Sequence, residues 1–122
     1  MTNLMDEIIG GARGTVKDPA FPHAPADWTP AVAVDAARKE NLDLGEEHWD
    51  ALRALQEYFA RHEGTPVNLR ELHDALDERF HRQGGIKHLY RLFPGGPVGQ
   101  GCRIAGLQVP AGAIDRGFGS VA

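Results

Sequence analysis

Apolar side chains at three- and four-residue spacing predict two amphipathic helices in the middle of the chain. The first begins near Gly45 and ends within residues 61–64. Its apolar stripe consists of Trp49, Leu52, Leu55, Tyr58 and Phe59. Asn68 caps the second helix, with Glu71 in the reciprocal position of a capping box. The apolar stripe of this helix consists of Leu69, Leu72, Leu76 and Phe80. Because plain amphipathic packing produces this spacing, the aromatic residues indicate a helical core and not an aromatic cofactor box.

Start and stop signals predict three further helices. Thr29 followed by Pro30 is typical of a helix start, and this helix should run to about Glu40. Residues 86–93 form a short helix between a Gly-Gly break and Pro94. A last short helix, from about Pro97 to Ala105, carries Cys102. We therefore expect a single, mainly α domain over residues 1–122, built as a small bundle of about five helices.

The two ends of the chain carry weaker signals. Residues 1–26 form a variable N-terminal segment, in which residues 1–13 could make one short helical turn. Three prolines in residues 14–27 permit at most an irregular β-hairpin, and an extended loop is the alternative. Residues 107–122 are expected to form a mobile, flexible C-terminal arm.

Composition narrows the class of protein. An apolar share of 42% and a charged share of 25% are typical of a globular domain. No run approaches the roughly eighteen apolar residues that a membrane span needs, so no membrane role is expected. The N-terminus lacks the basic lead and apolar core of a secretion signal. One cysteine excludes an internal disulfide. A reducing cytoplasm is therefore the expected location.

Binding of nucleic acid is a weaker alternative. The two central helices, joined by a short turn, could form the helix-turn-helix of a DNA-binding regulator. However, the second of them carries four carboxylates that would face phosphate, and the net charge of the chain is −4. These carboxylates are Glu71, Asp74, Asp77 and Glu78. We expect no direct binding of nucleic acid.

The chemistry-bearing stretch spans residues 92–113, where glycine and proline leave no room for a long helix or a central strand. It contains Cys102, followed directly by Arg103, whose charge would lower the pKa of the thiol. Such a stretch is typical of an arm that presents a reactive thiol, although a lone cysteine is more often a small apolar residue packed under a helix. The six histidines show no metal-ligand spacing, and we expect neither a metal nor a cofactor.

The arrangement of this stretch resembles the C-terminal signature of the DsrC/TusE family of small sulfur-relay proteins. The matching residues are Leu92, Phe93, Pro94, Gly96, Pro97, Gln100, Cys102, Arg103, Ile104, Ala105, Gly106, Leu107 and Pro110. Similar segments precede it in the same order: Asp27 and Trp28, then residues 47–49 and 87–91. The resemblance covers about residues 27–113 and implies a protein that acts in cytoplasmic sulfur traffic through protein contacts.

One departure from the family pattern affects the expected function. Family members that carry sulfur hold a cysteine near the end of the arm, and this sequence has Ala113 at that place. Cys102 matches the second cysteine, eleven positions earlier, that the dissimilatory sulfur-metabolism members also possess. The resemblance therefore leaves Cys102 as the candidate persulfide acceptor.

Two functional hypotheses follow from the resemblance. In the first, the protein is a sulfur carrier, not a turnover enzyme, that accepts and passes persulfide sulfur between other sulfur-relay proteins. The residues expected to assist the thiolate or to bind partners are Arg103, Gly101, Gly106 and Pro110. In the second, it is a docking or regulatory paralogue without carrier activity. No small-molecule substrate is expected in either, and the sequence leaves open whether the pathway serves tRNA thiolation or sulfur oxidation or reduction.

Overall fold

The computed structural model describes residues 18–113, and within them it contains five α-helices and one short 3-10 helix. The α-helices are α1 (Pro30–Lys39), α2 (Glu46–Arg61), α3 (Leu69–Arg79), α4 (Gly85–Leu92) and α5 (Gly99–Ala105), and η2 (His81–Gln83) is the 3-10 helix. The described part of the chain has no strand. The prediction of a mainly α fold with five helices is confirmed.

The N-terminal expectations fall mostly outside these residues. The short helical turn predicted for residues 1–13 is not among the described residues, and neither are residues 14–17. Residues 18–27 form successive turns, in which the N–H of Phe21 donates to the Asp18 carbonyl and that of Ala24 donates to the Phe21 carbonyl. Prolines in this segment remove ladder donors, which explains why turns form here in place of paired strands.

Local signals set the helix starts where the sequence predicts them. The hydroxyl of Thr29 accepts the N–H of Val32 at 3.3 Å, with Pro30 in the first helical position of α1. The Asn68 side chain accepts the N–H of Glu71 at 3.0 Å and caps α3. Both contacts satisfy a backbone donor that the first helical turn leaves without a partner.

His48 joins the start of α2 to the end of α4. Its Nδ1 accepts the N–H of Gly45 at 3.0 Å, and its Nε2 lies 2.8 Å from the carbonyl of Leu92. Because Nδ1 acts as an acceptor, Nε2 carries the proton and donates to that carbonyl. His48 therefore has a structural role, because its ring links the two helices through hydrogen bonds.

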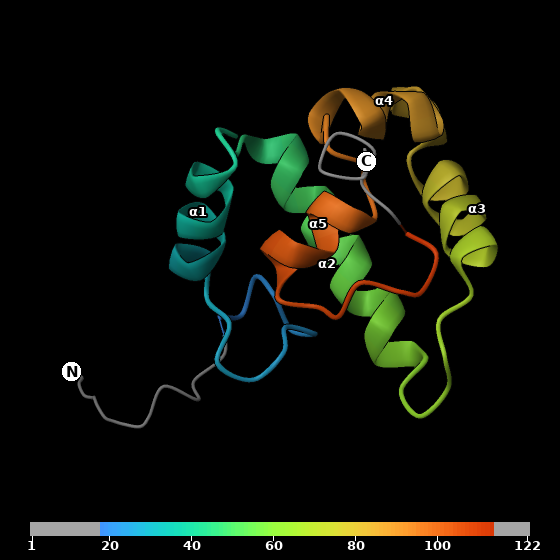
Figure 1. Ribbon diagram of the computed structural model, residues 1–122, viewed down its shortest axis with the longest axis horizontal. Coiled ribbons are helices and arrows are strands. Elements are labelled where there is room, and N and C mark those ends of the chain that lie inside the picture. The colour runs from blue at the N-terminus through green and yellow to red at the C-terminus, as the bar shows by residue number, and fades with distance from the viewer. Residues whose placement is uncertain (1–17, 114–122) are drawn as a thin grey trace.

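Helix α2 runs through the centre of the molecule, with α1 on one side and α3 on the other (Figure 1). The short helix α5 lies across α2 and contacts both α2 and α1, while α4 packs on α3. A segment close to the C-terminal end of the described chain thus lies in the middle of the fold.

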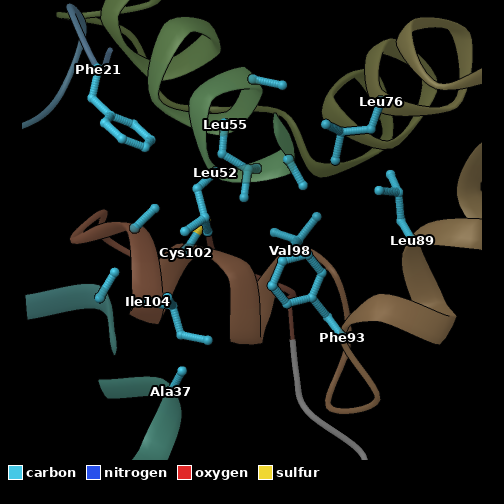
Figure 2. Close-up of a cluster of buried hydrophobic side chains, with 14 of the residues drawn as sticks. Phe21, Ala37, Leu52, Leu55, Leu76, Leu89, Phe93, Val98, Cys102 and Ile104 are labelled. Atoms are coloured by element: carbon cyan, nitrogen blue, oxygen red, sulfur yellow. The ribbon is translucent and has the colours of Figure 1, made fainter. Parts of the chain in front are cut away.

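The core is continuous from α1 to α4 through α5. Figure 2 shows Cys102, Val98 and Phe93 beneath the side chains of α2, with Ile104 directed toward Ala37 of α1. The largest fully buried side chains are Phe93, Leu52, Leu55, Leu72, Leu89, Ile104, Gln56 and Cys102. Two of these eight lie in α5, which makes this short helix part of the core.

Candidate functional site

Cys102 lies inside the protein. Its exposed fraction is 0%, and it belongs to the same buried cluster as Leu52 and Leu55 of α2. Figure 2 shows the sulfur on the side of α5 that faces α2. Of the two alternatives for this lone thiol, the structure has the one in which it packs as a small apolar residue under a helix. The short helix predicted from about Pro97 to Ala105 is present as α5, and because it belongs to the core it buries the thiol and does not present it on an exposed arm.

Burial also controls the acidity of the thiol. It raises the pKa of Cys102 from 9.0 to about 12, because the thiolate would lose its hydration in this apolar surrounding. The charge of Arg103 lowers the pKa, which is the predicted direction, but its effect is smaller than that of burial. In this conformation the thiol is protonated at neutral pH and is not a nucleophile.

Two glycines allow α5 to lie close to its neighbours. A Cβ atom at Gly101 would lie 2.7 Å from Cδ1 of Leu55, so a larger residue would push α5 away from α2. Gly106 ends α5 in the left-handed conformation, at φ 80° and ψ 21°. A Cβ atom there would lie 2.7 Å from Cδ1 of Trp28. Close packing therefore explains why glycine is present at both positions. Their predicted role in partner binding stays a prediction.

Arg103 forms a salt bridge with Glu40, the residue that caps the C-terminal end of α1. Its Nε donates to Oε2 of Glu40 at 2.9 Å, and its Nη2 donates to Oε1 of the same residue at 2.8 Å. Oε1 of Glu40 also accepts Nε2 of Gln100 at 2.9 Å. The hydrogen bond from Arg103 is the main reason why the pKa of Glu40 is lowered, with Gln100 contributing in the same direction. Glu40 is thus ionised at neutral pH and joins α1 to α5.

Two buried side chains hold the other end of α5. Nε1 of Trp28 donates to the Ile104 carbonyl at 2.9 Å, and Nε2 of Gln56 donates to the Ala105 carbonyl at 3.0 Å. The last carbonyls of a helix have no partner within the helix, so these donors satisfy two of the carbonyls at the end of α5.

Pro110, the remaining predicted site residue, lies away from the thiol. It follows α5 in the described part of the predicted arm, where Leu107 and Val109 pack against the core. Residues 107–111 form one wall of a hollow of about 680 Å³. Phe59 of α2, His62 directly after α2 and Pro66 of the α2–α3 connection also line this hollow. The structure therefore brings together Gly101, Cys102 and Arg103 on α5 and Gly106 at its C-cap, and it places Pro110 in a separate region.

Glu40 and Gln56 carry no sequence signal for the contacts that they make with α5. Glu40 lies 63 positions before Arg103, and Gln56 lies 49 positions before Ala105. In the sequence, Glu40 is only the approximate end of a predicted helix, and Gln56 lies outside the apolar stripe of the helix that contains it. Trp28 and Gln100 did carry a signal, because both belong to the residues that resemble the DsrC/TusE pattern.

These features define a small helical protein with a single thiol, held on a short C-terminal helix that the rest of the fold encloses. No helix of residues 18–113 has the length and apolar character needed to cross a membrane. A family model described as "DsrC like protein" matches residues 9–114. The chain belongs to this family, and the identification made from the residues is confirmed.

Similar proteins agree with this assignment. The chain is 34% identical over 109 residues to "Sulfurtransferase TusE" of Photorhabdus laumondii, which covers 88% of this chain and 92% of the relative. It is 34% identical over 90 residues to the protein of the same name from Escherichia coli, covering 73% of this chain and 82% of the relative. The NMR structure of Allochromatium vinosum DsrC matches with a TM-score of 0.59 and 43% identity, covering 72% of this chain and 79% of that chain. The family is one of sulfur-relay proteins, which favours relay over the helix-turn-helix alternative.

Proposed function

We propose that this protein acts in cytoplasmic sulfur relay by binding other sulfur-transfer proteins, with Cys102 as the acceptor of persulfide sulfur. The family match over residues 9–114 carries this proposal. Relatives named sulfurtransferase support transfer between proteins. Cys102 is the only cysteine of the sequence, so any persulfide of this chain must form there.

The transfer step needs no external oxidant or reductant. The Cys102 thiolate attacks the outer sulfur of a donor persulfide, a new sulfur–sulfur bond forms at Cys102, and the sulfur–sulfur bond of the donor breaks. The donor leaves as a thiolate with the electron pair of that bond and takes up a proton from water. The reverse reaction with the thiolate of an acceptor protein regenerates Cys102.

Burial of the thiol sets a condition on this step. Because Cys102 has an exposed fraction of 0%, the donor sulfur reaches it only after α5 moves away from α2. Local opening of a short element is a common way for buried groups to react. The described conformation is therefore the closed state of the proposed carrier.

A second function is favoured by the same burial and by Ala113 in place of the terminal cysteine. In this alternative the protein binds sulfur-relay partners without carrying sulfur, and it competes with a true carrier or regulates it. The fold would then present a surface, and Cys102 would be only a core residue.

Mass spectrometry separates the two functions. After incubation with a small-molecule persulfide donor, the carrier hypothesis predicts one added sulfur atom, roughly 32 Da, on the wild type and none on Cys102→Ser. An adduct that survives the substitution would refute the assignment to Cys102. If no adduct forms on the wild type, while the wild type and Cys102→Ser bind a sulfurtransferase equally well, the docking function is correct.

A further inference from the structure

Helix α5 depends on its neighbours for its position. It has seven residues, too few for a helix that is stable by itself in water. Its C-terminal end is held by Trp28 and Gln56, which are 5% and 1% exposed. These two donors lie in the core and are out of reach of solvent or of a partner protein.

A second polar attachment of α5 within residues 18–113 lies at the surface. The Glu40 carboxylate receives Arg103 through both of its oxygens, and Gln100 through one of them. The side chains of Glu40 and Arg103 are 18% and 32% exposed. Oε1 of Gln100 also accepts the N–H of Gly95 at 3.0 Å, so the same cluster fixes the loop that leads into α5. We call Glu40, Gln100 and Arg103 the α5 clamp.

A surface hollow gives access to the clamp. Its volume is about 410 Å³, and it is lined by the end of α1, by Pro94 and Gly95, and by Glu40 and Gln100 themselves. Cys102 does not line this hollow. The clamp can therefore be reached from outside in a conformation in which the thiol cannot.

We propose that Glu40 is a positioning residue that keeps α5 closed over Cys102, so that loss of its carboxylate contacts exposes the thiol. This inference rests on the proposed function in one respect, since opening of α5 is the movement that persulfide transfer requires. Bidentate, charge-assisted hydrogen bonds between a guanidinium and a carboxylate are among the strong hydrogen bonds of proteins. Their loss removes an attachment of α5 that is independent of the apolar packing.

The test is the rate at which iodoacetamide alkylates Cys102 in the native protein. Glu40→Gln keeps the size of the side chain and one acceptor oxygen but removes the charge. We expect alkylation of this variant to be about ten times faster than that of the wild type, which corresponds to about 1.4 kcal/mol in the opening equilibrium. Glu40→Asp retains the charge on a shorter side chain, and its rate should lie between the two.

Glu57→Gln is the matched control. Glu57 is also a half-buried carboxylate, 24% exposed, and it pairs with Arg61 at 2.6 Å and Arg79 at 3.2 Å. It joins α2 to α3, and within residues 18–113 its hydrogen-bond and salt-bridge partners are Arg61 and Arg79, which lie outside the clamp. We expect iodoacetamide to alkylate Cys102 of this variant no faster than the change in its global stability explains.

Amide hydrogen exchange provides a readout that a general loss of stability would not reproduce. In Glu40→Gln, the amides of residues 100–107 should exchange faster, while those of α3 should keep their protection. Equal acceleration in α3 and α5, or alkylation that follows global stability equally in Glu40→Gln and Glu57→Gln, would overturn the inference.

Failure of this inference is distinguishable from failure of the proposed function, because iodoacetamide carries no sulfur to transfer. If Glu40→Gln accelerates alkylation and no persulfide forms at Cys102, the role of Glu40 stands and the carrier function is wrong. If alkylation is not accelerated, the role of Glu40 is wrong, whatever the persulfide assay gives.

Discussion

Replacement of Gly106 by alanine tests how tightly α5 is fixed to the fold. Gly106 has a positive φ of 80°, which is strained for alanine. The new methyl group would also lie 2.7 Å from Cδ1 of Trp28. Trp28 has little freedom to retreat, since its indole donates to the Ile104 carbonyl and its ring packs edge-on against Phe21 with centroids 5.1 Å apart.

The expected cost has two parts. The left-handed backbone conformation costs alanine about 1 kcal/mol. Overpacking against a side chain that cannot move adds about 1–3 kcal/mol, so Gly106→Ala should lose about 2–4 kcal/mol in all. Gly64 offers a matched control, because its φ is 87° and a Cβ atom there would meet nothing within 4 Å. Gly64→Ala should therefore lose only the backbone part, about 1 kcal/mol.

Urea unfolding followed by tryptophan fluorescence measures both variants, and Trp28 itself is one of the two reporters. In thermal unfolding, Gly106→Ala should melt about 10 °C below the wild type and Gly64→Ala about 3 °C below it. If the two variants lose equal free energy of unfolding, the close contact with Trp28 does not contribute to the cost of Gly106→Ala. The packing reason given for Gly106 would then be refuted.

Three further predictions concern the groups around α5. Cys102 has a pKa raised by burial from 9.0 to about 12, so its contribution to stability is complete below pH 9.0 and is lost as the pH rises toward 12. The free energy of unfolding of the wild type should fall relative to that of Cys102→Ala above pH 9.0, and a constant difference would contradict this. The pKa of Glu40 is lowered, mainly by its hydrogen bond from Arg103. The ionised carboxylate therefore stabilises the folded protein fully above 4.5, the pKa in the unfolded chain, and this stabilisation is lost as the pH falls through the lower pKa of the folded protein. Glu40→Gln should make acid denaturation less steep than in the wild type, and unchanged steepness would count against the clamp. Trp28→Phe leaves the buried Ile104 carbonyl without its indole donor and should cost about 1–3 kcal/mol in urea unfolding, and a cost near zero would show that this hydrogen bond contributes nothing.

The boundaries of the helices could be predicted because their signals are local. Thr29, Pro30 and Asn68 act within one helical turn of the residues that they cap, and the Gly-Gly pair marks the start of α4, with Gly84 as its N-cap and Gly85 as its first residue. The predicted last helix also exists, although it begins at Gly99 and not at Pro97. Where the physical cause and its effect are neighbours in the chain, the sequence is sufficient.

The environment of Cys102 could not be predicted in the same way. Glycine and proline around the thiol favoured an exposed arm, since these residues disfavour long regular elements. In the structure, Gly101 has the opposite effect, because the missing side chain allows α5 to approach Leu55 of α2. The same composition can thus bury a segment or release it, and the choice depends on a contact between residues 46 positions apart.

Burial and activation of the thiol are coupled through the position of α5. Two effects act on the pKa of Cys102, a large increase from burial and a smaller decrease from Arg103. Movement of α5 away from α2 removes the first effect, while Arg103 remains adjacent to Cys102 in the chain. The movement also separates Arg103 from Glu40, whose carboxylate otherwise offsets its charge. A single conformational change would therefore both expose the sulfur and lower its pKa, so that an accessible Cys102 is also a more reactive one.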